Sequence, residues 1–153
     1  MRLLVTSDSH RAAGNLLDIV EMHRADSDLL IFLGDGESDL ENVRLLYPDI
    51  RILQVAGNCD WGSDLPAYSY AQAAGKTILY THGHPFHVKN GLVELEHAAR
   101  AANADICLFG HTHGQYTDHK DGLYIMNPGA VAEGYYGMVD ITPGGIMLLP
   151  CRL

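Results

Sequence analysis

The feature that most constrains the fold of this chain is a series of short apolar runs, each followed by a polar turn. Five runs of strand length precede Gly110: Leu3 to Thr6, Leu29 to Leu33, Ile52 to Ala56, Thr77 to Tyr80 and Ile106 to Phe109. Such short, near-continuous apolar runs are typical of strands that are buried on both faces of a sheet. We therefore expect sheets that other elements cover on both sides.

Helical patterns lie between these runs. In two segments, residues at helical spacings share one face: Leu16, Ile19, Val20 and His23 in the first, and the apolar Leu92, Leu95, Ala99 and Ala102 in the second. We predict a third helix that begins with a capping box formed by Ser38 and Glu41 and that ends before Pro48. The alternation of strands and helices favours an α/β fold.

The pattern after Gly110 is that of β-strands. Runs that fit strands are Gln115 to His119, Leu123 to Met126, Tyr136 to Ile141 and Ile146 to Leu149, with turns at Asp121-Gly122 and Pro143-Gly144-Gly145. Two packed sheets with helices on the outside would satisfy both parts of the chain. At 153 residues, we expect one domain that spans residues 1–153.

Charge and cysteine content narrow the classes of function and location. The net charge is −9, and the 10 Lys and Arg residues are scattered, which argues against binding to DNA or RNA. We find no apolar stretch of about 20 residues and no signal peptide, so neither a membrane association nor export is expected. Cys59, Cys107 and Cys151 show no paired spacing, which favours the reducing cytoplasm, and Cys107 and Cys151 are expected to be buried.

The turns that follow the five apolar runs are rich in metal-binding residue types. In order they read Asp8-Ser9-His10, Gly34-Asp35, Gly57-Asn58-Cys59-Asp60, His82-Gly83-His84 and Gly110-His111-Thr112-His113. Each turn alone is weak evidence for a binding site, because Asp and Asn also favour ordinary turns. In α/β sheets, however, ligands bind outside the carboxyl ends of the strands, so five such turns predict one convergent site.

The residue types in these turns fit divalent cations. Seven side chains are candidate ligands: Asp8, His10, Asp35, Asn58, His82, His111 and His113. Carboxylate, amide oxygen and neutral imidazole suit Mn²⁺, Fe²⁺, Co²⁺, Ni²⁺ or Zn²⁺. Seven ligands are too many for one ion, and they suit two ions that share a carboxylate. Two ions about 3.5 Å apart are the usual arrangement for phosphoryl transfer.

The ordered blocks from Asp8 to Asn127-Pro128-Gly129 resemble those of the calcineurin-like metallophosphoesterase family, particularly its small bacterial and archaeal phosphodiesterases. The resemblance implies a four-layer αββα sandwich of two mixed sheets flanked by helices. It also implies that Asp8, His10 and His113 hold one ion. Asn58, His82 and His111 would hold the other, and Asp35 would bridge the two. Mn²⁺ is the first expectation among the metals.

We expect a hydrolase that uses a hydroxide activated by two metal ions to cleave a small phosphodiester. A phosphomonoesterase acting on a small metabolite is an alternative within enzymes. A non-catalytic interaction scaffold is an alternative from another class, because this fold also serves in membrane-coat assembly. A nuclease is disfavoured by the acidic charge. Whether the protein forms a homo-oligomer stays open.

The sequence departs from the family pattern at Cys59. Many members carry a histidine there, which donates a proton or contacts the phosphate. A thiol, whose ordinary pKa is about 8.5, is a poor replacement for an imidazolium. His84 and His87 follow a candidate ligand and are the alternative proton donors, unless they only support it or face the solvent.

Several other polar and aromatic residues have two readings. Asp60 either orients its neighbours through hydrogen bonds or caps a turn. Aromatic residues either form a wall for a nucleoside or aryl group or pack in the core: Trp61, Phe86, Tyr135 and Tyr136. Glu37 and Asp39 suit a helix start and are not counted as ligands. Ordinary helix or strand positions are expected for His23, His97 and His119.

Overall fold

The computed structural model describes residues 1–153, which form two five-stranded sheets. The first sheet has the order β10-β9-β1-β2-β3 and the second the order β4-β5-β6-β8-β7. The strands are β1 (Arg2–Thr6), β2 (Leu29–Phe32), β3 (Ile52–Gln54), β4 (Tyr68–Ala73), β5 (Lys76–Thr81), β6 (Ile106–Leu108), β7 (Tyr116–Lys120), β8 (Leu123–Asn127), β9 (Tyr135–Thr142) and β10 (Gly145–Arg152). Parallel pairs join β1, β2 and β3 in one sheet and β5, β6 and β8 in the other, while the remaining pairs are antiparallel. Both sheets are therefore mixed.

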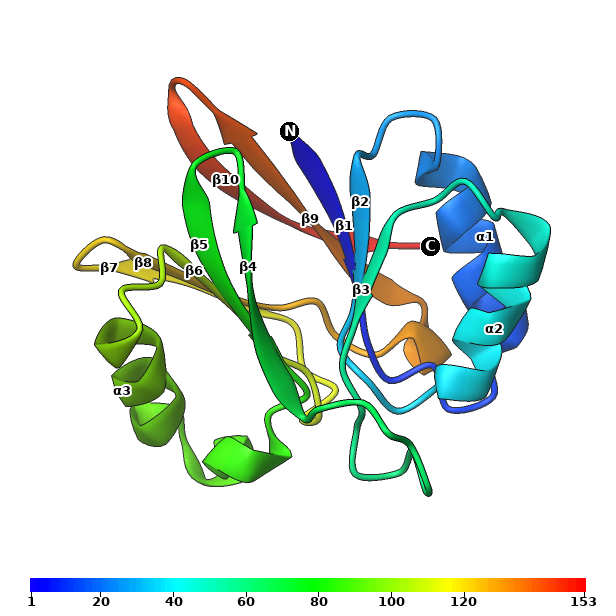
Figure 1. The fold of residues 1–153 in the computed structure, drawn as a ribbon, viewed down its shortest axis with the longest axis horizontal. Coiled ribbons are helices and arrows are strands. Elements are labelled where there is room, and N and C mark those ends of the chain that lie inside the picture. The colour runs from blue at the N-terminus through cyan, green and yellow to red at the C-terminus, as the bar shows by residue number, and fades with distance from the viewer.

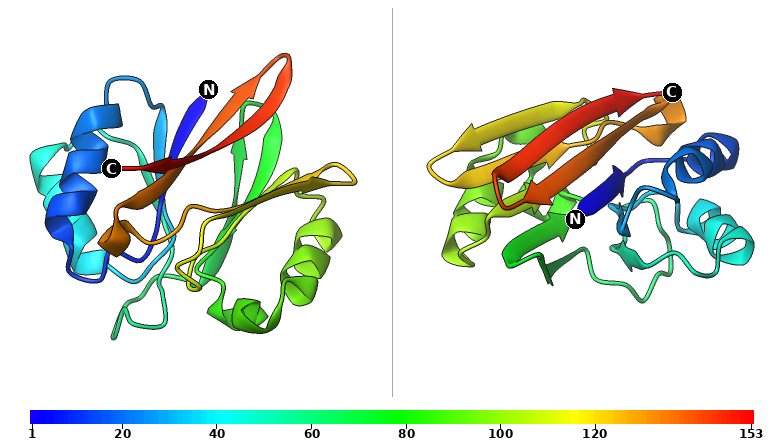
Figure 2. Two further views of the ribbon diagram at one scale, coloured as in Figure 1. Left: turned by 180° about the vertical axis from the view of Figure 1, so that it is seen from behind. Right: turned by 90° about the horizontal axis from the view of Figure 1, so that it is seen from above.

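Helices cover the outer faces of the two sheets. The helices are α1 (Ala13–His23), α2 (Glu37–Leu46) and α3 (Val93–Ala101), with short 3₁₀ helices η1 (His84–Phe86), η2 (Val88–Asn90) and η3 (Val131–Glu133). In Figures 1 and 2, α1 and α2 lie on one side of the molecule, α3 lies on the other, and the sheets face each other between them. The expected four-layer αββα sandwich is confirmed.

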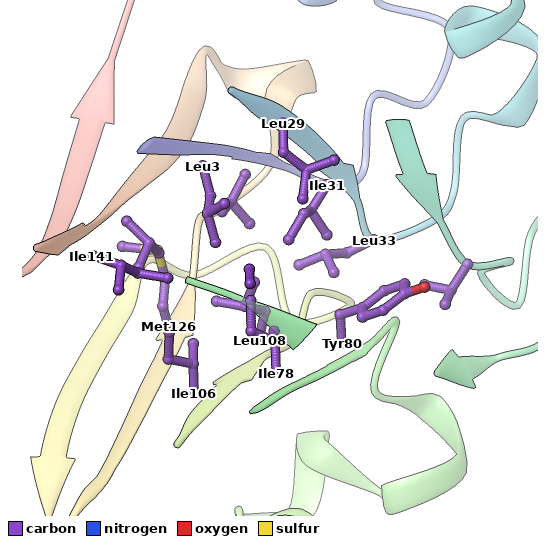
Figure 3. Close-up of a cluster of buried hydrophobic side chains, with 14 residues drawn as sticks. Leu3, Leu29, Ile31, Leu33, Ile78, Tyr80, Ile106, Leu108, Met126 and Ile141 are labelled. Carbon is purple, nitrogen blue, oxygen red and sulfur yellow. The ribbon is translucent and has the colours of Figure 1, made fainter. Parts of the chain in front are cut away.

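The main core fills the space between the sheets. Figure 3 shows its side chains, among them Leu3, Leu29 and Ile31 from the first sheet and Ile78, Ile106 and Leu108 from the second. Because alternate residues of a strand point to opposite faces, Leu3 and Val5 enter this core while Leu4 packs with α1 and α2. A third cluster joins α3 to the second sheet. The runs that form β1, β2 and β6 are thus strands buried on both faces, whereas β3, at the edge of its sheet, is only half-buried.

The capping box that we predicted for the third helix is wrong. α2 begins at Glu37, its N-cap residue is Gly36, and no side chain of the helix caps its amino end. Instead, the carboxylate of Asp60 accepts hydrogen bonds from the amides of Gly36 and Glu37, at 3.0 and 3.1 Å. A carboxylate from a distant turn therefore does what the local box was expected to do.

Four other points need correction. The sequence pattern missed β4, an edge strand that pairs with β5, and it extended the third strand to Ala56, whereas β3 ends at Gln54. The region after Gly110 is not β throughout, because η3 interrupts it. Cys107 is buried as expected, but Cys151 is only half-buried, since it lies on the edge strand β10.

None of the helices has the length and apolar character that crossing a membrane would require.

Candidate metal centre

The loops after β1, β2, β3, β5 and β6 gather at one end of the sheets, which is the lower end in Figure 1. Hydrogen bonds between the loops hold them there. The Asp8 amide donates to the Gly34 carbonyl at 2.9 Å, and the Gly110 amide donates to the His82 carbonyl at 2.9 Å. All seven candidate ligands lie on these loops, so the structure brings them to one place.

One cluster of candidate ligands consists of Asp8, His10 and His113, which we call the open cluster. The two imidazoles meet with their Nε2 atoms 3.2 Å apart. Asp8 Oδ1 lies 3.4 Å from His10 Nε2 and 3.3 Å from His113 Nε2. The imidazole side chains are 32% and 41% exposed, whereas Asp8 is fully buried. The open cluster therefore pairs an interior carboxylate with two solvent-accessible imidazoles.

Asp8 carries an unpartnered buried oxygen. Its Oδ2 accepts hydrogen bonds from Ser7 Oγ and from the His111 amide, while its Oδ1 is buried without any hydrogen-bond partner. Buried polar atoms in native proteins nearly always have partners, and an orphan calls for an explanation. A divalent cation held between Oδ1 and the imidazoles of His10 and His113 would supply the missing partner.

The second group, which we call the closed cluster, consists of Asp35, Asn58, His82 and His111. His82 is fully buried, and its Nδ1–H donates to the Leu33 carbonyl at 2.7 Å. This bond leaves the lone pair of His82 Nε2 directed at three atoms that also carry lone pairs: Asp35 Oδ2 at 3.2 Å, Asn58 Oδ1 at 3.0 Å and His111 Nδ1 at 3.1 Å. Four converging acceptors need a cation between them, either a proton or a metal ion.

Asp35 connects the two clusters. Its Oδ1 accepts a hydrogen bond from the Cys59 amide at 2.8 Å, which fixes the orientation of the carboxylate. Its Oδ2 then lies 3.2 Å from His82 Nε2 and 3.6 Å from His10 Nε2. Gly57 is required beside it, because a Cβ at that position would overlap the carboxylate. The residues present therefore fit two divalent cations that share one carboxylate.

The protonation of the closed cluster follows from its charges. Burial opposes ionisation of Asp35, but the hydrogen bond and charge of His82 outweigh it and hold the pKa of Asp35 well below its usual range. Burial also opposes the charged form of His82, yet Asp35 and Asp8 raise its pKa. Burial and the neighbouring His82 lower the pKa of His111 to about 4. His111 is therefore neutral near pH 7, the form that binds a metal ion.

Much of this edge has a left-handed backbone. Five candidate ligands have positive φ: Asp8 (55°), His10 (41°), Asp35 (60°), His111 (72°) and His113 (65°). A residue other than glycine in this region costs on the order of 1–3 kcal/mol and persists only where the surrounding structure enforces it. The concentration of such residues at one edge is typical of a functional site.

Hydrogen bonds from residues outside the two clusters fix the loops. Asp60 accepts from the amides of Asp35 and Gly57, each at 2.8 Å, in addition to those at the start of α2, so it both orients its neighbours and caps a turn. Asp39 accepts from Ser9 Oγ at 2.6 Å. Buried Asn127 donates to Thr112 Oγ1 at 2.9 Å and to the Gly110 carbonyl at 3.1 Å. Sequence reasoning placed Asp39 at a helix start and Asn127 in a family block, but it assigned neither of them these contacts, because their partners are distant along the chain.

Two of the candidate proton donors lie beside the ligands and one does not. Cys59 is largely exposed, and the partial desolvation of its thiol together with the charge of Asp35 raises the pKa of that thiol. The ring of His84 lies 5.4 Å from that of His82, between centroids, and burial lowers the pKa of His84. His87 instead pairs with Glu94 at 2.9 Å on the exposed surface.

The four aromatic residues do not form one wall. Tyr136 is buried and hydrogen-bonded to His23 at 2.8 Å, and the ring of Tyr135 lies beneath Arg152. Phe86 packs beside the cluster around α3, whereas Trp61 is 90% exposed. His23 and His119 occupy ordinary positions on α1 and β7, and His97 lies on α3. Of these four, Trp61 is the one that lines a depression together with candidate ligands, His10 and Asp35.

Comparisons with known proteins agree with this geometry. Residues 1–142 match the family model described as the calcineurin-like phosphoesterase superfamily domain. The chain is 33% identical over 131 residues to a Bacillus subtilis (strain 168) protein named probable metallophosphoesterase YsnB, an alignment that covers 86% of this chain and 75% of that protein.

Solved structures share the fold. A structure described as a novel archaeal phosphodiesterase superposes with a TM-score of 0.80 at 18% identity, covering 99% of this chain and 100% of the other. Vps29 from Entamoeba histolytica, solved in complex with Zn²⁺, superposes with a TM-score of 0.75 at 21% identity, and the alignment covers 99% of both chains.

Proposed function

The chain belongs to the calcineurin-like phosphoesterase superfamily, and from that premise we propose that it hydrolyses a small phosphodiester with two bound divalent cations. The observation that carries the proposal is the position of Asp35 Oδ2 between the open and closed clusters. Bound cations would lower the pKa of a water molecule toward neutrality and would offset charge that develops on the phosphoryl group.

Each cluster has a role in this proposal. Asp8, His10 and His113 would hold one ion, while Asn58, His82 and His111 would hold the other, with Asp35 common to both. The hydrogen bond from His82 Nδ1 to Leu33 keeps Nε2 free to bind. Mn²⁺ is our first choice of ion, because the ligand set mixes carboxylate and amide oxygens with imidazole nitrogens. The Zn²⁺ in the Vps29 neighbour supports zinc as the second choice.

The chain supplies only weak acids for the leaving group. Hydrolysis forms a P–O bond to the oxygen of water, breaks the P–O bond to the departing alcohol and delivers a proton to that alcohol. Near pH 7 the Cys59 thiol is protonated but a weak acid, and the lowered pKa of His84 leaves that imidazole neutral. We therefore propose that phosphoesters with acidic leaving groups, such as aryl esters, are the better substrates.

The test is removal and return of metal. Protein that has been stripped with a chelator should hydrolyse neither aryl phosphodiesters nor aryl phosphomonoesters, and Mn²⁺ should restore activity, with the diester preferred. Full activity in the stripped protein would contradict the proposal. A preference for the monoester would favour the phosphomonoesterase alternative.

An interaction scaffold is the second candidate, and the similarity to Vps29, whose name stands for a vacuolar protein sorting component, is the observation that favours it. A scaffold should bind metal and yet turn over no phosphoester with any added ion.

For the nuclease alternative, the test is the effect of salt concentration. Steeply salt-dependent binding to DNA or RNA would support a nuclease, whereas we expect only modest effects of salt on the hydrolysis of a small diester. The three free cysteines support the cytoplasm as the proposed location.

A further inference from the structure

A groove leaves the metal centre on the side of the open cluster. Two adjoining depressions of about 420 Å³ each share a wall made by Ser38, Cys59, Asp60 and Trp61. The nearer one also contains His10, Arg11 and Asp35. The farther one also contains Glu37, Glu41, Gly62 and Ser63. We call the pair the side groove. Ligand sites commonly have volumes of roughly 300–1,000 Å³, so one arm of a small substrate fits here.

Trp61 forms the apolar surface of the side groove. It is 90% exposed and lines both depressions. A single exposed apolar residue is common on protein surfaces and by itself is little evidence for a binding site. Trp61, however, is two residues from Cys59, on the turn that also bears the candidate ligand Asn58. An indole in that position offers a flat face on which an aromatic group can stack.

Arg11 brings a free positive charge to the nearer depression. It follows the candidate ligand His10, and its guanidinium forms no salt bridge, although the chain has a net charge of −9. Its backbone is fixed, because φ is 72° and its amide donates to Asp39 Oδ2 at 2.9 Å. A guanidinium held beside a cation site is suited to the oxygens of a phosphate group.

The farther depression is suited to a neutral group with hydroxyls. Glu37 and Glu41 stand on α2, and Ser38 and Ser63 add hydroxyl groups, while no Lys or Arg lines this part. Carboxylates accept hydrogen bonds from hydroxyl and amino groups, but they repel a second phosphate. An arm that ends in another phosphate is therefore disfavoured.

We propose that the side groove binds the nucleoside arm of a nucleoside phosphodiester, an inference that rests on the proposed function. The base stacks on Trp61, the phosphate contacts Arg11 at the metal centre, and sugar or base donors reach Glu37 and Glu41. The groove thus selects diesters with one aromatic, hydroxyl-bearing arm over diesters with a small alkyl arm.

Two esters with the same leaving group test this selection. Thymidine 5′-(4-nitrophenyl phosphate) and methyl 4-nitrophenyl phosphate both release nitrophenolate, so a difference between them reports on the retained arm. We expect Trp61→Ala to lower kcat/KM for the thymidine ester about 10-fold more than for the methyl ester, the scale of one base–aromatic stack. Leu45→Ala, which removes a side chain that is 80% exposed on α2, is the matched control and should change neither. Equal losses for both esters, or no loss for either, would overturn the inference.

Fluorescence provides a readout that does not depend on turnover. Trp61 is the only tryptophan in the chain, so the tryptophan emission, excited selectively over that of the tyrosines, reports on the side groove alone. Adenosine 5′-monophosphate added to the Mn²⁺-loaded protein should quench it at saturable concentrations, and inorganic phosphate should not. Arg11→Gln should weaken this binding. If the parent protein hydrolyses neither ester, the proposed function fails. The fluorescence titration then tests nucleoside binding in the side groove by itself, and absence of quenching by the nucleotide refutes that binding.

Discussion

The two ends of β1 differ in how their polar groups are satisfied. At its amino end, Arg2 donates to Asp140 at 2.7 and 2.9 Å and to Asp26 at 3.0 Å. Beyond its carboxyl end, Asp8 Oδ1 is buried without a hydrogen-bond partner, and Asp8 itself has a left-handed backbone. The same strand thus has a paired end, which stabilises the fold, and an unpaired end, where candidate ligands have a strained backbone and an unpartnered buried oxygen.

The largest expected effect is a loss of catalytic activity when a carboxylate near the unpaired end is changed, compared with a carboxylate at the paired end. Asp35→Asn removes the charge that both clusters share, and we expect kcat/KM for an aryl phosphodiester to fall by about 10³-fold, the upper range for losing a group that stabilises developing charge. Asp140→Asn removes a carboxylate at the paired end and should leave kcat/KM within about twofold, because Asp140 contacts Arg2 and none of the candidate ligands. Metal content after dialysis should fall only in Asp35→Asn. An active Asp35→Asn protein would break the comparison.

The next effect concerns proton donation at the unpaired end. Cys59→His supplies the imidazole that many family members carry, and it should speed esters with poor leaving groups by roughly 10²-fold while changing activated aryl esters little. The measurement is a leaving-group series on the parent, Cys59→His, His84→Ala and His87→Ala proteins. His87→Ala is the built-in control, because His87 pairs with Glu94 on the surface. If the rate of the parent does not depend on leaving-group acidity, and if this remains so in His84→Ala and His87→Ala, the hypothesis that the site lacks an effective proton donor is wrong.

A smaller effect tests the paired end by pH. The hydrogen bond and charge of Arg2 lower the pKa of Asp140. Because the folded-state pKa lies below the unfolded value of about 3.9, the pair stabilises the fold fully above that value and loses its effect as the pH falls through the folded pKa.

Asp140→Asn should therefore reduce the free energy of unfolding by about 1 kcal/mol at pH 7, as expected for a well-oriented but partly exposed pair. The difference from the parent should shrink below about pH 4. Urea denaturation of metal-free protein at pH 7, 5 and 3 measures it. A difference that grows on acidification would have the wrong sign.

The smallest effect tests the strain at the unpaired end. His113 has a φ of 65° and is 41% exposed, so His113→Gly relieves the backbone at little loss of packing. We expect the metal-free protein to gain about 0.5–1 kcal/mol of stability while metal binding weakens. His119→Gly on β7, whose backbone has no positive φ, is the control and should lose stability. A loss in His113→Gly would mean that His113 is a structural residue.

Local patterns were enough to predict most of the fold. The strands that contain Leu3 and Leu29 could be predicted because both faces of each strand are buried, so that the sequence shows a near-continuous apolar run. β4 was missed although Tyr68 and Tyr70 alternate with inward-facing residues, the period of an edge strand. The Ser38–Glu41 box failed because Asp60, more than 20 residues away, satisfies the amides of α2. Local sequence reading cannot find a competitor of that kind.

The candidate site was predictable in its membership but not in its geometry. Asp8 and His113 could be named because each lies in a turn after a buried strand. Their strands, β1 and β6, belong to different sheets, and it is the packing of one sheet on the other that brings their carboxyl ends together. That Asp35 Oδ2 stands between the clusters depends on the Cys59 amide holding Oδ1, a contact between two loops. The free guanidinium of Arg11 likewise depends on which carboxylates reach it in three dimensions, which no spacing in the sequence encodes.

The central position of β1 has a consequence for how the protein is made. β1 lies between β2 and β9, and Leu3 pairs with Leu29 on one side and with Val139 on the other. On the ribosome, the β2 side can form early, but the other side of β1 must wait until residues 135–142 have been synthesised. Pairing over such a separation also makes folding slow. The nascent chain therefore carries an open strand edge beside Asp8 for most of its synthesis, a period in which a chaperone that covers that edge would prevent aggregation.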